Sequence, residues 1–171
     1  IENIRLIKKD VTENDIFISS SFSHISCYYF TIYYVNSSKF RNNIYKWLRP
    51  NGWFIVHLVD LDKFDPILDV ASPFVGLDPQ KYSKNRITES KVHFKKFIYK
   101  SNFELNRNNA IFYESFKFKD KPVIRNQKHV LQNFKIDDFI KQMTKLNMDL
   151  KYSTNLESIG YRNQYILYFQ K

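Results

Sequence analysis

Residues 47–57 read WLRPNGWFIVH, and this stretch decides the fold. Pro50, Asn51 and Gly52 form a break between two hydrophobic patterns of different period. Before the break, apolar residues recur at the spacing of one helical face: Phe40, Ile44, Trp47 and Leu48. After it, residues 53–59 are apolar on both faces, which is typical of a strand buried in a parallel sheet. The stretch therefore predicts a helix, a turn and a buried strand.

The residues upstream complete a strand–helix–strand unit. Residues 22–29 form a second apolar run rich in β-favouring residues. Asn36, Ser37 and Ser38 then offer N-caps for the helix. Two buried strands joined by a helix predict a right-handed βαβ unit. Further upstream, residues 4–9 predict a short strand that ends at Asp10.

Downstream of Asp60 the pattern changes. Residues 62–86 contain Pro66, Pro73 and Pro79 and predict an irregular loop. Three strands are then expected, over residues 92–105, 110–119 and 128–134, as an antiparallel meander with one exposed face. A helix over residues 136–146 is expected next. The last two predicted strands, residues 150–153 and 164–169, should pair antiparallel at one edge of the first sheet.

Three segments resemble the class I S-adenosylmethionine-dependent methyltransferases. Residues 6–11 (LIKKDV) are similar to the third strand of that family, and residues 22–34 (FSHISCYYFTIYY) to the fourth strand with its outgoing loop. Residues 47–57 resemble the family's leucine–basic–proline–glycine–glycine turn into the fifth strand. The resemblance implies an α/β fold: a partial Rossmann-like methyltransferase sheet with a terminal antiparallel hairpin. It implies one domain over residues 1–171, with an inserted β-meander at 92–134 acting as a substrate-facing lid.

The sequence also departs from the family pattern. Ser23 stands where the fourth strand usually opens with Asp, and Asn51-Gly52 replaces two glycines. The glycine-rich cofactor loop and the acidic residue that binds the ribose are absent, and we expect both to lie upstream of Ile1. The chain is therefore expected to be a fragment that is inactive as given.

The resemblance implies where S-adenosylmethionine binds. Ligands of open α/β sheets lie beyond the carboxyl ends of the strands. The family's adenine contacts correspond to Asp10 and Val11, and the methionine end should lie against Cys27, Tyr28 and Tyr29. Asp10 has an alternative role as a turn cap, and residues 27–29 have one as core packing.

The same rule selects candidate catalytic and substrate residues. His57 and Asp60 end the strand after the turn, where either could accept a proton; alternatively they are polar residues satisfied at a strand end. Tyr33 and Tyr34 precede the helix, where aromatic rings suit a cationic or planar substrate. The family's Asn-Pro-Pro-aromatic motif is absent, which argues against amino methylation of adenine or cytosine but not against the expected small-molecule or RNA cap-like acceptor. The four histidines show no metal-ligand spacing, so no metal is expected.

The composition leaves a second hypothesis open. The net charge is +10, but the basic residues are scattered, and the abundance of Lys, Asn, Ile, Phe and Tyr is what an AT-rich genome would produce. Lysines and aromatic residues interleave across residues 94–119, so a single-stranded nucleic-acid-binding module is the alternative. Cys27 is the only cysteine, which fits a reducing compartment such as the cytoplasm. No apolar run is long enough to span a bilayer, so no membrane partner is expected.

Overall fold

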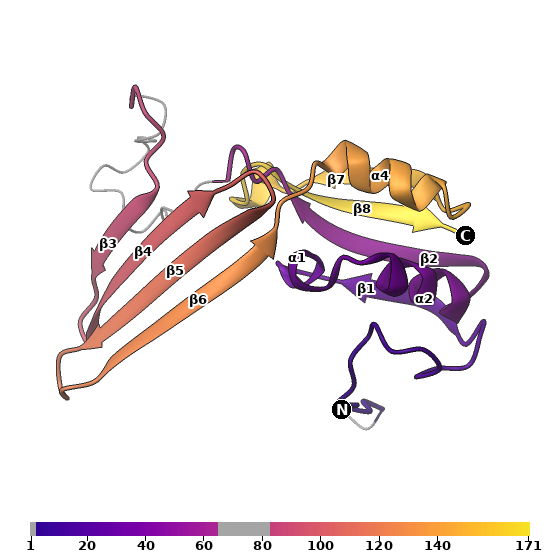
Figure 1. Ribbon diagram of the computed structural model, residues 1–171, viewed down its shortest axis with the longest axis horizontal. Coiled ribbons are helices and arrows are strands. Elements are labelled where there is room, and N and C mark those ends of the chain that lie inside the picture. The colour runs from indigo at the N-terminus through magenta and orange to yellow at the C-terminus, as the bar shows by residue number, and fades with distance from the viewer. Residues whose placement is uncertain (1–2, 65–82) are drawn as a thin grey trace.

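The computed structural model describes residues 3–64 and 83–171 and contains two four-stranded sheets (Figure 1). The main sheet has the strand order β1-β2-β8-β7. The second sheet, which we call the meander, has the order β3-β4-β5-β6. In Figure 1 the two sheets extend in opposite directions from the segments that join them. The expected mixed α/β architecture is confirmed.

The βαβ unit forms as predicted. Strands β1 (Phe22–Cys27) and β2 (Leu48–Val59) pair in parallel, with Cys27 opposite Val56. The chain passes between them through α1 (Thr31–Val35) and α2 (Ser38–Trp47). Ser37 is the N-cap of α2, since its hydroxyl accepts a hydrogen bond from the Phe40 amide at 3.1 Å.

The predicted turn at residues 50–52 is instead a wide bulge inside β2. Phe22 lies opposite Leu48, whereas His24 lies opposite Trp53, so the extra residues of β2 loop out between these pairs. Asn51 adopts a left-handed conformation with φ of 60°. A Cβ on Gly52 would lie 2.8 Å from the carbonyl oxygen of Arg49, closer than a side chain can approach. The bulge therefore requires the Asn-Gly pair, although it does not end the strand.

The C-terminal part of the chain completes the main sheet. It comprises α4 (Ile136–Thr144), β7 (Asp149–Asn155), the 3-10 helix η2 (Glu157–Ile159) and β8 (Gln164–Gln170). Strand β8 is antiparallel to both β2 and β7, which confirms the hairpin at the sheet edge. The core lies between this sheet and the helices, and its fully buried large side chains include Tyr33, Ile44, Phe54, Phe139, Met143 and Phe169.

The meander consists of β3 (Glu89–His93), β4 (Phe97–Leu105), β5 (Asn109–Phe118) and β6 (Ile124–Gln132). Each strand is antiparallel to the next, as predicted. Residues 92–105 form two strands and not one, because the chain turns where the Phe94 amide donates to the Phe97 carbonyl at 2.9 Å. The last strand begins earlier than expected, since residues 124–127 pair along β5 despite their weak apolar character.

The predicted strand at residues 4–9 is wrong. Leu6 is 92% exposed and Ile4 is 66% exposed, and the segment has no β-structure. Within the described residues β1 is an edge strand of the main sheet, and residues 4–9 do not pair with it. An apolar alternation forms a strand only where a partner strand satisfies its backbone.

Of the irregular loop predicted at residues 62–86, residues 65–82 lie outside the described residues. Among the described helices, none has the length and apolar character that crossing a membrane requires.

Candidate functional site

The carboxyl ends of β1 and β2 lie side by side because the two strands are parallel. One end continues into Tyr28 and Tyr29, and the other into Asp60. Val11, Cys27 and Tyr28 line one cavity of about 400 Å³, so the structure brings together three of the five residues predicted to bind the cofactor. Tyr29 is 70% exposed and has a left-handed backbone with φ of 55°, and it lines a different cavity.

The loop that carries Val11 is held by a residue that the sequence analysis missed. Asn43 on α2 is buried, and its Nδ2 donates to the carbonyl oxygens of Val11 at 3.0 Å and Glu13 at 2.9 Å. A polar residue on a helical pattern carried no signal for this contact, because its partners lie about thirty residues away.

Asp10 acts as the cap of its own turn. Its carboxylate accepts hydrogen bonds from the Thr12 amide at 2.9 Å and the Thr12 hydroxyl at 2.8 Å. These hydrogen bonds hold the pKa of Asp10 below its ordinary value. The carboxylate is exposed, and Val11 alone of the predicted adenine pair lines the cavity.

Cys27 is 6% exposed, and burial raises the pKa of its thiol to about 11. The sulfur is therefore a neutral thiol at physiological pH, and it can pack against a ligand but cannot act as a nucleophile.

His57 is 6% exposed and lines a cavity of about 310 Å³ together with Tyr28, Tyr29 and Tyr161. Burial lowers the pKa of His57, so the imidazole is neutral at physiological pH. Its Nε2 atom is buried and has no hydrogen-bond partner among the described residues. A buried unpaired nitrogen is costly, so this atom is a feature that the fold of the described residues leaves unexplained.

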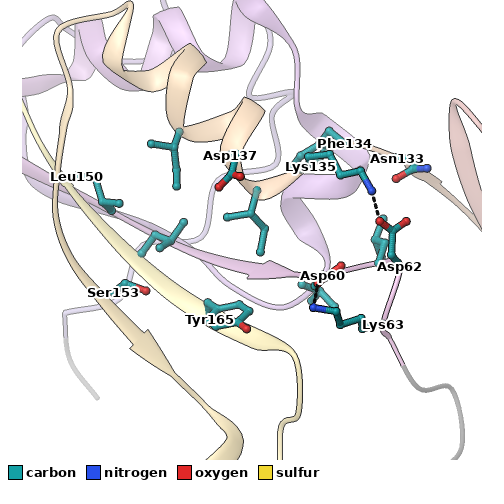
Figure 2. Close-up of a pocket in the computed structure, with 15 residues that line it drawn as sticks. Asp60, Asp62, Lys63, Asn133, Phe134, Lys135, Asp137, Leu150, Ser153 and Tyr165 are labelled. Carbon is teal, nitrogen blue, oxygen red and sulfur yellow. Dashed lines mark hydrogen bonds and ion pairs between the residues drawn. The ribbon is translucent and has the colours of Figure 1, made fainter. Parts of the chain in front are cut away.

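Asp60 lies in a different cavity, of about 540 Å³, beneath the N-terminal end of α4 (Figure 2). Its carboxylate forms an ion pair with Lys63 at 3.3 Å. His57 and Asp60 were both predicted at the end of β2, facing one cleft. The two side chains instead line separate cavities. Residues three apart on an extended chain point to opposite sides.

The two predicted substrate tyrosines occupy different environments. Tyr33 is fully buried: its hydroxyl bonds both the carbonyl and the amide of Val59, at 2.7 and 2.5 Å, and its ring stacks on Phe134. Burial raises the pKa of Tyr33. Tyr34 is 47% exposed, and its hydroxyl lies 2.6 Å from Nδ1 of His129 in the meander. Tyr34 is thus accessible to a substrate, whereas Tyr33 supports the end of β2.

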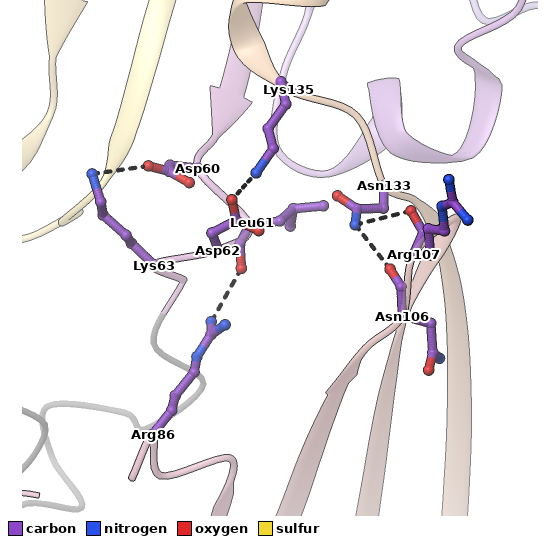
Figure 3. A network of polar contacts seen from close by, with 9 residues as sticks. All are labelled: Asp60, Leu61, Asp62, Lys63, Arg86, Asn106, Arg107, Asn133 and Lys135. Carbon is purple, nitrogen blue, oxygen red and sulfur yellow. Dashed lines mark hydrogen bonds and ion pairs between the residues drawn. The ribbon is translucent and has the colours of Figure 1, made fainter. Parts of the chain in front are cut away.

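The chain leaves the main sheet after β2 and returns to it between β6 and α4. Polar contacts hold both connecting segments in place (Figure 3). Lys135 pairs with Asp62, which joins the outgoing and returning segments. Arg86 donates to the carbonyls of Leu61, at 3.1 Å, and Phe64. Asn133 donates to the carbonyl of Asn106 at 2.9 Å. The position of the meander is therefore fixed by residues at its base.

Part of the aromatic and part of the lysine content of the meander lies on opposite faces. Phe97 lies opposite Phe118 and Tyr99 opposite Phe116, all on the face that also carries Glu114. Lys100 and Lys117 belong to the opposite face. Neighbours in a strand alternate between faces, yet basic and aromatic side chains still meet at two places: Nζ of Lys128 lies 5.4 Å from the ring centroid of Tyr113, and Nζ of Lys121 lies 4.6 Å from that of Phe118. The alternative of a single-stranded nucleic-acid-binding module gains no support from this register.

No group of three or more His, Cys, Asp or Glu side chains in residues 3–64 and 83–171 is arranged to hold a metal ion. The expectation of a metal-independent site stays a prediction.

Comparisons with known proteins identify the fold. No family model and no curated protein matches the sequence. Among solved structures, an S-adenosylmethionine-dependent methyltransferase from Clostridium acetobutylicum superposes with a TM-score of 0.70 at 15% identity over 98% of this chain. The amino pentose methyltransferase CalS10 from Micromonospora echinaspora gives 0.58 at 10% identity over 95% of the chain. The sugar N-methyltransferase KedS8 from Streptoalloteichus gives 0.58 at 13% identity over 96%.

This likeness confirms the predicted Rossmann-like methyltransferase fold. The chain spans 65%, 63% and 61% of the lengths of these three proteins, respectively.

Proposed function

We propose that this chain is part of an enzyme that transfers a methyl group from S-adenosylmethionine to a small-molecule acceptor. The observation that carries the proposal is the likeness of nearly the whole chain, meander included, to S-adenosylmethionine-dependent methyltransferases, two of which are named for sugar acceptors. The cavity lined by Tyr28, Tyr29 and His57 lies at the carboxyl end of β1, where open α/β sheets bind their ligands.

The cavity along β1 suits one side of the cofactor. Its volume of about 400 Å³ and its mainly apolar lining match a small-molecule site, and Ser26 and Thr31 add a few polar groups. We propose that Val11, Cys27 and Tyr28 enclose the cofactor there, with Asp10 at the rim and Tyr29 beside the methionine end. When bound, S-adenosylmethionine supplies a methyl group already activated on a sulfonium. The chain has then to align the acceptor, exclude water and take up a proton.

The face of the meander that carries Glu114 suits an amine acceptor. Glu114 lies among aromatic side chains on that face, with its carboxylate 18% exposed. A carboxylate and aromatic rings both attract an ammonium group. CalS10 and KedS8 are named for an amino pentose and for sugar N-methylation, which agrees with this chemistry. We propose that the meander is the substrate-facing lid and that the acceptor is a small amine. An RNA cap-like acceptor and a nucleic-acid partner gain no support from the contacts or the comparisons.

Of the two candidate catalytic residues, His57 lines the cavity at the carboxyl end of β1, whereas Asp60 lines a separate cavity beneath α4. The imidazole is neutral and its Nε2 is unpaired among the described residues, whereas the Asp60 carboxylate is paired with Lys63. We propose that His57 binds the reacting ligands in the cavity that it shares with Tyr29, and that Asp60 orients the segment at the base of the meander.

Isothermal titration of S-adenosylmethionine into the full-length protein tests the cofactor site. Tyr28→Ala should weaken binding about tenfold, because Tyr28 lines both cavities at the end of β1. Tyr152→Ala is the matched control, since Tyr152 is 65% exposed on β7 and lines none of these cavities. Absence of cofactor binding by the full-length protein would overturn the proposed function.

The lid is tested by transfer of a labelled methyl group to glucosamine. Tyr99→Ala should reduce turnover of the acceptor and leave cofactor affinity unchanged. Loss of cofactor affinity in that variant, with turnover unchanged, would contradict the assignment of the meander to the acceptor.

A further inference from the structure

Four side chains from four elements form one continuous hydrogen-bonded chain between the main sheet and the meander. The hydroxyl of Tyr34 on α1 lies 2.6 Å from Nδ1 of His129 on β6. Nε2 of His129 lies 3.1 Å from Oε2 of Glu114 on β5. The other carboxylate oxygen, Oε1, accepts a hydrogen bond from the hydroxyl of Tyr99 on β4 at 2.8 Å. Tyr34 and His129 are 95 positions apart in the sequence, so this chain exists only in the folded protein.

The direction of each hydrogen bond follows from the chemistry of the groups. An ionised carboxylate only accepts, so His129 donates from Nε2 to Glu114. In the neutral imidazole Nδ1 is then the acceptor, and it receives the hydroxyl proton of Tyr34. As a hydrogen-bond donor to His129, the phenolic oxygen of Tyr34 still has lone pairs that can accept a hydrogen bond. The carboxylate thus fixes the tautomer of the histidine, and the histidine orients the tyrosine.

The exposure of Glu114, His129 and Tyr34 supports a role in proton transfer in addition to a structural role. Exposure increases along the chain: the side chain of Glu114 is 18% exposed, that of His129 is 32% exposed, and Tyr34 is 47% exposed. The inner carboxylate is therefore largely shielded from solvent, while the outer tyrosine is half exposed. A base held by an inner carboxylate and directed at an outer hydroxyl is the arrangement that activates a hydroxyl in triad enzymes.

Among the described residues, few other charged groups lie close enough to His129 to stabilise or destabilise a charge on its imidazole ring. Tyr34 contacts His129 from α1, and Glu114 contacts it from β5. The ring centroid of Phe112, which carries no charge, lies 6.2 Å from that of His129. On β6, Gln127 can donate to Glu114 at 3.3 Å when its amide is turned, and it then accepts from Arg125 at 2.6 Å. From β4, Tyr99 contributes a neutral donor to Glu114, and burial raises the pKa of that phenol. A proton taken up by His129 would therefore be stabilised chiefly by Glu114.

We propose that Tyr34 is the proton acceptor for the methyl acceptor, with His129 and Glu114 as positioning residues that act through it. The proposal rests on the proposed methyltransferase function and assigns the substrate as an amine that binds in its ammonium form. Tyr34 takes one proton from the ammonium and passes its own hydroxyl proton to Nδ1 of His129. The free amine lone pair then forms the bond to the methyl carbon, and the bond from that carbon to the sulfonium sulfur breaks. One methyl group and its positive charge move from sulfur to nitrogen, and one proton remains on the imidazolium beside Glu114.

The kinetic test uses the full-length protein with labelled S-adenosylmethionine, with glucosamine as the amine probe and glucose as the matched sugar without an amino group. Tyr34→Phe should lower kcat for glucosamine about 100-fold, with unchanged cofactor affinity and melting temperature. Glu114→Gln should lower kcat about tenfold with the KM for glucosamine unchanged, because the imidazolium loses its carboxylate partner. Tyr113→Phe is the control: Tyr113 neighbours Glu114 in sequence but belongs to the opposite face of β5, and its turnover should equal that of the wild type.

A second readout does not depend on turnover. In the presence of S-adenosylhomocysteine, glucosamine should shift the Nδ1 resonance of His129 in the wild type, and Tyr34→Phe should abolish the shift. No shift in the wild type, or an equal shift in Tyr34→Phe, overturns the relay. So does methyl transfer to glucosamine that Tyr34→Phe leaves within a factor of about two. Transfer to glucose in place of glucosamine overturns the amine assignment. Loss of cofactor binding in the wild type, in contrast, would overturn the proposed function itself.

Discussion

The main sheet and the meander are both four-stranded, yet they bury different kinds of side chain. In the main sheet, β2 and β8 bury Phe54, Val56, Leu167 and Phe169 under α2 and α4. In the meander, the centre of the face that carries Glu114 also holds Tyr99 and Ser101, and Phe103 packs nearer the base. Apolar side chains at these buried positions would stabilise the meander more than the polar ones do. Polar side chains at such positions therefore indicate a functional role. We infer that the main sheet supplies rigidity and the meander supplies acceptor chemistry.

The largest effect should come from the core of the main sheet. Phe139 on α4 is fully buried and contacts the rings of Phe134 and Phe169. Phe139→Ala should lower the free energy of unfolding by about 3–5 kcal/mol in urea denaturation. Phe118→Ala, on the less buried end of β5, should cost about 1 kcal/mol. Equal losses at the two positions would break the comparison between the sheets.

The second effect tests how the main sheet holds the end of β2. Tyr33→Phe removes the hydroxyl that satisfies both backbone groups of Val59. Leaving them buried without a partner should cost about 1–3 kcal/mol of unfolding free energy, measured by the same denaturation. Tyr29→Phe is the matched control, because Tyr29 is 70% exposed, and it should change stability by less than about 0.5 kcal/mol.

The third effect appears at alkaline pH. Burial raises the pKa of Cys27 to about 11, above its ordinary value of 9.0. A pKa raised in the folded state contributes stability that is complete below the unfolded pKa and is lost as pH rises through the folded value. Between pH 9 and 10 the wild type should therefore lose about 1 kcal/mol more stability than Cys27→Ala. Parallel stability curves for the two proteins would show that Cys27 is not buried as described.

The smallest effect should come from the outer face of the meander. Lys100 is exposed there, opposite Ser115 and away from the Glu114 relay. Lys100→Ala should change the unfolding free energy by less than about 0.5 kcal/mol and leave acceptor turnover unaltered. A loss of turnover comparable to that of Tyr99→Ala would place the acceptor on the wrong face of the meander.

Local patterns predicted much of this fold. The helical face from Phe40 to Trp47, the serine cap and the apolar runs on either side predicted the βαβ unit, because periodicity and capping are local properties. The order of meander, helix and closing hairpin was also readable from alternation and turns. The strand predicted at residues 4–9 shows the limit of this approach, since a strand depends on a partner that no local pattern specifies.

The candidate site was only partly readable. The strand ends singled out Cys27, Tyr28, His57 and Tyr34, and the structure places each of them beside a cavity or in the relay. It also separated His57 from Asp60 and buried Tyr33, because the direction of a side chain is set by strand alternation and by the elements packed against it.

His129 and Glu114 had no signal of their own in the sequence. They are ordinary members of an alternating pattern until the antiparallel register sets Gln127 opposite Glu114 and brings His129 within reach of its carboxylate. The packing of β6 against α1 then places Tyr34 on the other side of the same imidazole. The sequence by itself determined the elements and their order, because hydrophobic period and turn chemistry act over a few residues. Only the tertiary structure decided which polar groups meet, since contacts between residues 15 and 95 positions apart arise from register and packing, which no local pattern encodes.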